Sequence, residues 1–284
     1  MIAGEGAVIA GVDGTGEADA ALRWAAGEAA LRKVRLHLVY AFAPLAGQEG
    51  AGLPVLRKAF AALERDGHRL LEEAVREVPA DVPVTTEMAS HPPVPVLLEH
   101  SKHARMIVLG APDDTGLVSM LAGSTLSAVT AHARCPVVVV RGEGRDGPVV
   151  VGVAGAPASE SAVAAAFDEV TWRGAALAAV HAVGEAEHAG PSPREQQAIL
   201  GEERVVLSAS LAGWREKYPD VRVDEIVVAG EPRKTLLDFS RQAQLVVVGT
   251  RGHGGFTGLL LGSTSHALIH HAHCPVMIIR SAPS

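Results

Sequence analysis

The chain contains an internal repeat, and this repeat limits the folds that it can adopt. Residues 135–141 and 274–280 both begin with Cys-Pro, continue with four aliphatic residues and end with arginine. Near the start of each copy, residues 8–14 correspond to residues 149–155 in the same way. Each copy is long enough to enclose its own hydrophobic core, so we predict two tandem domains.

The expected boundary between the domains is the polar, glycine-rich segment 142–148, which has the composition of a linker. We therefore place the first domain at residues 1–142 and the second at residues 148–284. Two copies of this size form a tandem pair, in contrast to the short stacked units of a solenoid.

Short aliphatic runs alternate with helix-like stretches within the first copy. The expected strands lie at residues 7–12, 36–41, 82–88, 106–110 and 137–140, and the expected helices lie at residues 17–31, 55–78, 96–103 and 124–133. Continuous Val, Ile and Leu content is typical of parallel strands buried on both faces. With right-handed crossovers, this pattern predicts an α/β fold in which each copy is a doubly wound, five-stranded parallel sheet. Ligands of such sheets bind beyond the carboxyl ends of the strands.

Composition narrows the classes of function. The net charge of −7 argues against a nucleic-acid-binding surface, which is normally basic. We see no apolar stretch long enough to cross a membrane and no signal peptide at the amino terminus. Cys135 and Cys274 occupy equivalent positions of the two copies, which indicates duplicated structure instead of a disulfide. We therefore expect a cytoplasmic protein.

A glycine-dense loop in the second copy is the strongest candidate binding site. Gly249 ends an expected strand, Gly252 follows three residues later, and Gly262 precedes Ser263, which we expect to cap a helix. The backbone N–H groups of such a loop, together with the helix N-terminus, can bind phosphate. A flexible surface loop with an ordinary serine cap is the alternative. A loop of the same length, with the same closing Gly-Ser-Thr, occurs at residues 110–125 of the first copy and makes this alternative weaker.

The spacing Gly249-x2-Gly252-x9-Gly262-Ser263 resembles the ATP-binding motif of the universal stress protein family. Asp13 at the end of the first strand and the two Cys-Pro steps extend this resemblance over nearly the whole chain, as two tandem copies. The resemblance implies that an aspartate and the backbone near the end of the second strand hold adenosine, and that the glycine loop and its serine hold phosphates. The candidate nucleotide-binding residues are Gly249, Gly252, Gly262, Ser263, Thr264, Val180, Arg251 and His253 in the second copy and Asp13, Val39, Gly110, Gly123 and Ser124 in the first.

Neither copy has the complete set of these residues. The first copy has Asp113 in place of the second motif glycine, followed by Asp114, and two carboxylates repel a triphosphate. The second copy keeps the motif glycines but has Ala154 where the first has Asp13, so it lacks one polar contact to the nucleoside. Because losing one polar contact costs only about 1–3 kcal/mol, we predict that the second copy is the better nucleotide site.

The resemblance implies a universal stress protein that binds ATP, with any Mg²⁺ carried by the nucleotide, and that regulates a stress response through an unidentified protein partner. Two alternatives stay open. One is a nucleotide-free interaction protein whose sites are relics, and the other is an ATP-using transferase or ligase in which Asp113 and Asp114 hold a metal. We identify no catalytic residue, although slow ATP hydrolysis is possible in the family.

Two further features lead to predictions. His270, His271, His273 and Cys274 form a cluster with zinc-ligand chemistry, but only His271 and Cys274 have counterparts in the first copy, so we interpret the cluster as structural. The last strands, at residues 137–140 and 276–279, are apolar edges that we expect to be covered. In the family the equivalent strands meet across a two-fold axis, so the two halves are expected to form a pseudo-dimer, and a homodimer of the whole chain stays open.

Overall fold

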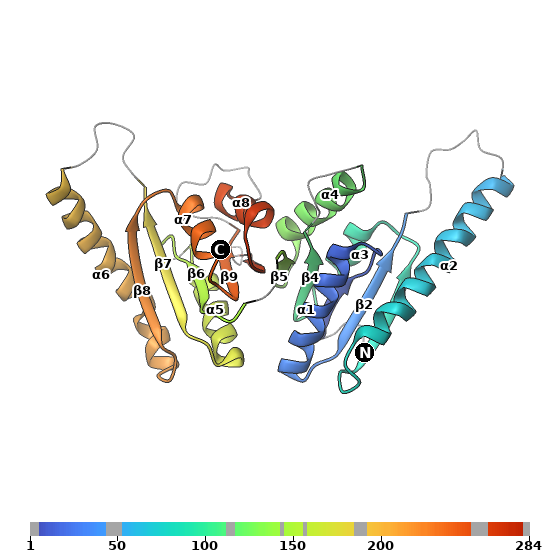
Figure 1. Cartoon of the computed structure of the whole chain (residues 1–284), viewed down its shortest axis with the longest axis horizontal. Helices are drawn as coiled ribbons and strands as arrows, with labels where there is room; N and C mark the ends of the chain where they lie inside the picture. The colour runs from blue at the N-terminus through green and yellow to red at the C-terminus, as the bar shows by residue number, and fades with distance from the viewer. Residues whose placement is uncertain are drawn as a thin grey trace. The chain divides into compact units, whose positions relative to one another are not determined.

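The computed structural model describes residues 6–43, 53–111, 117–142, 145–155, 158–184, 192–250 and 261–280, with only the backbone described for residues 53–57, 59 and 117–123 (Figure 1). The chain divides into two compact units, Met1–Val140 and Arg141–Ser284. We call them unit 1 and unit 2 and describe each on its own.

Unit 1 alternates strands and helices along its whole length (Figure 1). Its elements are β1 (Val8–Gly11), α1 (Gly16–Arg32), β2 (Leu36–Ala41), α2 (Leu53–Glu77), β3 (Val84–Ala89), α3 (Pro93–His100), β4 (Met106–Gly110), α4 (Leu117–His132) and β5 (Val137–Val140). The strands are parallel and lie in the order β3-β2-β1-β4-β5.

Unit 2 repeats this arrangement (Figure 1). Its elements are β6 (Val149–Gly152), α5 (Glu160–Arg173), β7 (Leu177–Val183), α6 (Pro193–Lys217), β8 (Val223–Ala229), α7 (Pro232–Phe239), β9 (Leu245–Gly249), α8 (Ser263–His271) and β10 (Val276–Ile279). The strand order is β8-β7-β6-β9-β10, again parallel. The predicted doubly wound α/β fold is therefore confirmed in both units.

The strand order reverses at one place in each sheet. The chain moves outward from β1 to β2 and β3, then returns to place β4 on the other side of β1, and unit 2 does the same around β6. The carboxyl ends of β1 and β4, and of β6 and β9, are therefore the switch points at which sheets of this class bind ligands.

The two faces of the unit 1 sheet are covered by different helices. Helices α1 and α2 contact each other, and α3 contacts α4. Neighbouring residues of a strand point to opposite faces. The ring of Tyr40 packs over Gly67 of α2, whereas His37, three residues earlier in β2, lies beside His100 of α3. The sheet is thus enclosed on both sides, which explains why its central strands β1 and β4 are largely aliphatic and buried.

The structure corrects two predicted helix starts. Helix α3 begins at Pro93 instead of residue 96, because proline is well accepted in the first turn of a helix, where its missing N–H would have no partner. Helix α4 begins at Leu117 instead of Ser124 and passes through Gly123 and Ser124. The residues before Gly123 include strong helix formers such as Leu121, and one interior glycine costs only about 1 kcal/mol relative to alanine.

Both cysteines lie inside the hydrophobic core of their unit. Cys135 and Cys274 are free and buried, and burial raises the pKa of each thiol to about 12, so both stay protonated at neutral pH. Within the described part of the chain, no helix combines the length and the apolar character that a membrane span needs.

Candidate functional site

The start of α8 lies at the predicted phosphate site of unit 2. Gly262 is extended and serves as the N-cap residue, and its carbonyl accepts the first helical hydrogen bond from the His266 N–H at 2.9 Å. No side chain of the described residues caps this end of the helix. The N–H groups of Ser263, Thr264 and Ser265 therefore lack an acceptor within the helix, and the positive end of the helix dipole lies beside them.

The prediction that Ser263 caps α8 is wrong. Gly262 takes the cap position, and Ser263 becomes the first helical residue with an exposed side chain. The physical reason is the extended backbone of Gly262, which directs its carbonyl along the helix. As a result, the Ser263 hydroxyl is not used to close the helix and faces solvent at the same end as the open N–H groups.

Two hydrogen bonds fix the ends of the glycine loop beside the strand. The Gly262 N–H donates to the Thr250 carbonyl at 2.8 Å, and the buried Ser265 hydroxyl donates to the Gly249 carbonyl at 2.7 Å. Both acceptors directly follow or end β9. The start of α8 is thereby held at the carboxyl edge of the sheet, at the switch point of unit 2.

In the described backbone of unit 1, no helix starts at the equivalent position. Gly123 and Ser124 correspond to Gly262 and Ser263, but they lie inside α4, well after its first residue, Leu117. Within a helix, backbone N–H groups donate to carbonyls four residues earlier. The backbone N–H groups that have no acceptor within α8 of unit 2 are therefore engaged in the α4 helix of unit 1.

Asp13 lies at the carboxyl end of β1, as the sequence predicts. Its carboxylate is exposed and accepts hydrogen bonds from the Thr15 N–H at 2.9 Å and the Thr15 hydroxyl at 2.6 Å. The Thr15 hydroxyl in turn accepts from the Ala18 N–H and caps α1. Asp13 thus shapes the turn into α1 and still presents carboxylate oxygen to solvent.

In unit 2, Ala154 stands at the position of Asp13, and only its backbone N–H takes part in the turn. The Ala154 N–H donates to the hydroxyl of Ser159 at 2.7 Å, and Ser159 is buried before the start of α5. The turn after β6 is therefore closed by a serine that comes from the helix side. The Ser159 hydroxyl thus supplies a hydrogen bond at the place where unit 2 lacks the aspartate.

Gly110 has a packing role in unit 1. A Cβ atom at this position would lie 2.4 Å from the carbonyl oxygen of Glu17 in the first turn of α1. Only glycine lets α1 approach the end of β4 this closely. The predicted ligand role of Gly110 is thus not needed to explain why glycine occurs there.

The second strands supply less free backbone than the resemblance implies. The carbonyl of Val39 accepts from the Val12 N–H, and the carbonyl of Val180 accepts from the Val153 N–H, each at 2.9 Å. Both valines are buried. The carbonyl groups of these two valines therefore already take part in the sheet.

His181 is a site residue that the sequence did not single out. It follows Val180 in β7, and its Nδ1 lies 2.7 Å from the Val153 carbonyl oxygen, while its Nε2 lies 3.1 Å from a carboxylate oxygen of Glu203 in α6. This places a partly exposed imidazole over the end of β6. The only signal in the sequence is the exchange of Tyr40 for His181 between the two copies.

Several predicted residues lie outside the part of the chain that the structure describes. These are Arg251, Gly252 and His253 in unit 2, and Asp113 and Asp114 in unit 1. Of the cluster near the carboxyl terminus, Cys274 is fully buried as a protonated thiol, and the rings of His266 and His270 lie 4.5 Å apart. The interpretation of that cluster as structural stays a prediction.

Comparisons with known proteins extend over the whole chain. The family model described as "Universal stress protein family" matches residues 6–141 and 147–280. A universal stress protein of Mycolicibacterium smegmatis is 39% identical over 288 residues, which cover 96% of each chain. A universal stress protein of Mycobacterium tuberculosis is 38% identical over 288 residues, which cover 97% of each chain.

The solved structures agree with the fold. A universal stress protein from Archaeoglobus fulgidus aligns with a TM-score of 0.70 and 18% identity, covering 96% of both chains. At this identity the likeness concerns the fold alone. The sequence relatives and the family match on both units, together with this fold, show that the chain is a member of the universal stress protein family with two tandem domains.

Proposed function

We propose that this protein binds ATP or a related adenine nucleotide through unit 2 and acts as a stress-response regulator through protein partners. The observation that carries the proposal is the open start of α8. Three backbone N–H groups and an exposed serine hydroxyl lie together at the switch point of the sheet, at the end of a loop with the glycine spacing of the family's nucleotide motif.

The charge around this helix start supports an anionic ligand. The first turn of α8 contains no acidic residue, and the positive end of the helix dipole adds about half an elementary charge. In this proposal the phosphates lie against Ser263 and Thr264, and the adenosine lies toward the ends of β6 and β7, where His181 borders the site. Mg²⁺ enters with the nucleotide and is held by phosphate and water oxygens.

The same reasoning assigns a weaker role to unit 1. Its copy of the Gly-Ser-Thr sequence lies inside α4, and its loop carries Asp113 and Asp114, which repel phosphate. Asp13 alone offers a contact to a nucleoside without a place for the phosphates. We therefore propose one nucleotide per chain.

A pair of matched substitutions tests this proposal. Ser263→Asp places a carboxylate next to the bound phosphates while keeping a residue that stabilises a helix N-terminus. Repulsion between charges about 4 Å apart is worth about 1 kcal/mol in water and about 4 kcal/mol near a protein surface. Calorimetric titration of the full chain with ATP is expected to show binding weakened about tenfold or more.

Ser124→Asp is the control, because Ser124 is the equivalent exposed residue of unit 1 and lies within α4. It is expected to leave ATP binding unchanged. Saturable binding that weakens only with Ser124→Asp would reverse the assignment of the site. If the wild-type chain shows no saturable binding at millimolar ATP, the protein is a nucleotide-free interaction protein instead.

A further inference from the structure

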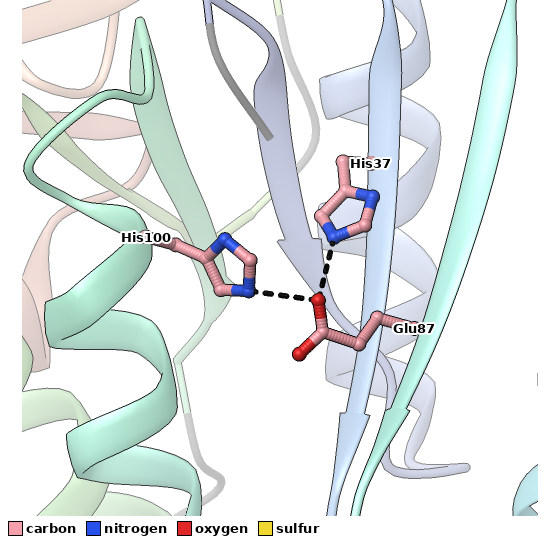
Figure 2. A group of neighbouring side chains, drawn as sticks. All are labelled: His37, Glu87 and His100. Atoms are coloured by element: carbon pink, nitrogen blue, oxygen red, sulfur yellow. Dashed lines mark hydrogen bonds and ion pairs between the residues drawn. The ribbon is translucent and has the colours of Figure 1, made fainter. Parts of the chain in front are cut away.

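Two histidines and a glutamate converge on one point in unit 1 (Figure 2). His37 comes from β2, Glu87 from β3 and His100 from the last position of α3. One carboxylate oxygen of Glu87 lies 3.3 Å from His37 Nε2 and 3.1 Å from His100 Nε2. Among the described residues, this is the one group of three or more His, Cys, Asp or Glu side chains whose ligand atoms come this close together, all within 4.8 Å.

These distances match the coordination sphere of a small metal ion. A tetrahedral zinc ion with bonds of about 2.0–2.1 Å holds neighbouring ligand atoms about 3.3–3.4 Å apart. The separation of 3.3 Å between Glu87 and His37 already has this size, and the separation of 3.1 Å between Glu87 and His100 is slightly shorter. The two imidazole rings are tilted by 56° with their centroids 5.1 Å apart, so both nitrogens face the carboxylate instead of stacking on each other.

Thr85 supports the orientation of His37. The Thr85 hydroxyl oxygen lies 2.9 Å from His37 Nδ1, on the side of the ring away from Glu87. A histidine that binds a metal through one nitrogen commonly donates its other N–H to an oxygen atom, which fixes the ring. Because a hydroxyl both donates and accepts, Thr85 bonds to Nδ1 whether Nε2 carries a proton or a metal ion.

Unit 2 shows that the fold itself does not need these three residues. The strand registers pair Val39 with Glu87 and Val180 with Ile226, so Ile226 takes the place of Glu87. By the same correspondence, Ala178 takes the place of His37, and Phe239, the last residue of α7, takes the place of His100. The three positions that hold apolar residues in unit 2 thus hold three potential metal ligands in unit 1.

The cluster is sheltered but open to an ion. The side chain of His37 is fully buried, that of His100 is 10% exposed, and that of Glu87 is 34% exposed. Glu87 leaves one side of the cluster in contact with solvent, where a water molecule can complete a tetrahedral sphere.

We propose that His37, Glu87 and His100 form a Zn²⁺ site that joins β2, β3 and α3 of unit 1. Two imidazoles and one carboxylate are ligands that suit zinc among the divalent metals. The fourth position is taken by water. This site is separate from the nucleotide proposal, and neither depends on the other.

The test is titration of the metal-free full chain with Zn²⁺, with Co²⁺ absorption as a second readout of tetrahedral coordination. The wild-type chain is expected to bind one Zn²⁺ and to melt at a higher temperature when it is bound. Glu87→Gln and His100→Gln are expected to weaken binding by more than about tenfold, and Thr85→Val by about tenfold or more through the lost support of His37.

His103→Ala is the matched control, because His103 is exposed and lies close to His100 in the sequence without joining the cluster. It is expected to leave zinc binding unchanged. Circular dichroism checks that each variant is folded. Zinc affinity that stays at the wild-type level in folded Glu87→Gln and His100→Gln would overturn the proposal.

X-ray absorption of the zinc-loaded wild-type chain tests the site without any substitution. The expected spectrum shows two imidazole ligands, zinc–nitrogen and zinc–oxygen distances of about 2.0–2.2 Å and no sulfur. A sulfur ligand at about 2.3 Å would instead assign the metal to a cysteine site and contradict the proposal. A wild-type chain that takes up no zinc also contradicts it.

Discussion

Individual glycines of the two loops have different physical reasons to be glycine. Gly262 is the N-cap of α8, where its extended backbone leaves the helix start open. Gly110 instead lies against the first turn of α1, where a side chain would collide with the Glu17 carbonyl. The resemblance assigns a ligand role to both glycines, but of these two positions only Gly262 lies at the start of a helix.

Gly110→Ala is therefore expected to destabilise unit 1 by about 1–3 kcal/mol, because the new methyl group overpacks a backbone contact. Gly27→Ala is the control: Gly27 is an exposed residue within α1, and apart from its chain neighbours and the nearby backbone of its own helix, no atom of the described residues lies within 4 Å of its added Cβ. This change is expected to stabilise unit 1 by about 0.5–1 kcal/mol. Urea unfolding followed by Trp24 fluorescence, with Trp172 and Trp214 replaced by Phe, measures both. Equal effects of the two substitutions would contradict the packing role.

Helices that occupy equivalent places in the two units differ in where they begin, and this difference decides the function that we propose. Residues 251–260 contain four glycines, whereas residues 112–121 contain one. Because each interior glycine costs a helix about 1 kcal/mol, α8 begins after its glycine-rich segment and α4 begins earlier. A small change in composition thus converts an open helix start into the interior of a helix.

The equivalent helices α1 and α5 each contain an ion pair with a buried glutamate. Glu28 and Arg32 in α1, and Glu169 and Arg173 in α5, form ion pairs between residues four apart, with both glutamates buried. The two pairs occupy corresponding positions of the two copies. Each pair brings opposite charges into direct contact inside the protein, so removing one member takes a direct charge partner away from the other.

Glu169→Ala is expected to destabilise unit 2 by about 3–5 kcal/mol for this reason. Asp238→Ala removes a partner of the exposed Arg241 in the same unit and is expected to change the free energy of unfolding by at most about 1 kcal/mol. Fluorescence of Trp172 and Trp214 in a Trp24→Phe background reports unit 2 alone. A loss below about 1 kcal/mol for Glu169→Ala would show that the buried pair contributes no more than a surface pair.

The sequence predicts elements better than it predicts their ends and their contacts. The predicted strands agree with β1 to β5 within two residues, because aliphatic runs mark buried parallel strands directly. The predicted start of α4 is wrong because glycine and serine are common at helix boundaries, whereas here the helix-forming residues before Gly123 continue the helix. The predicted cap of α8 is wrong because serine is a common cap residue, whereas here the backbone of Gly262 decides the helix start.

The histidine cluster of unit 1 has no signal in the sequence. His37, Glu87 and His100 lie far apart along the chain and do not have the spacing of a metal-binding motif. They meet only because the register of β2 and β3 and the packing of α3 bring them to one face. His181 is hard to predict for a similar reason, since its contact with Glu203 joins a strand to a distant part of α6.

The whole molecule is a duplication in which the fold is kept twice and the sites have diverged. Both units have five parallel strands with the same switch point. Among the described residues, only unit 2 begins a helix at the Gly-Ser step of the motif, and only unit 1 carries the His37, Glu87 and His100 cluster. We expect the two halves of the chain to bind different ligands, a nucleotide in unit 2 and a metal ion in unit 1.

A crystal structure of the full chain grown with millimolar ATP shows which unit binds the nucleotide, because it locates the ligand in each unit separately. We expect a polyphosphate against the N–H groups of Ser263, Thr264 and Ser265, with the region around Ser124 in α4 free of nucleotide. Nucleotide bound beside Asp13 in unit 1, with the start of α8 unoccupied, would contradict this expectation.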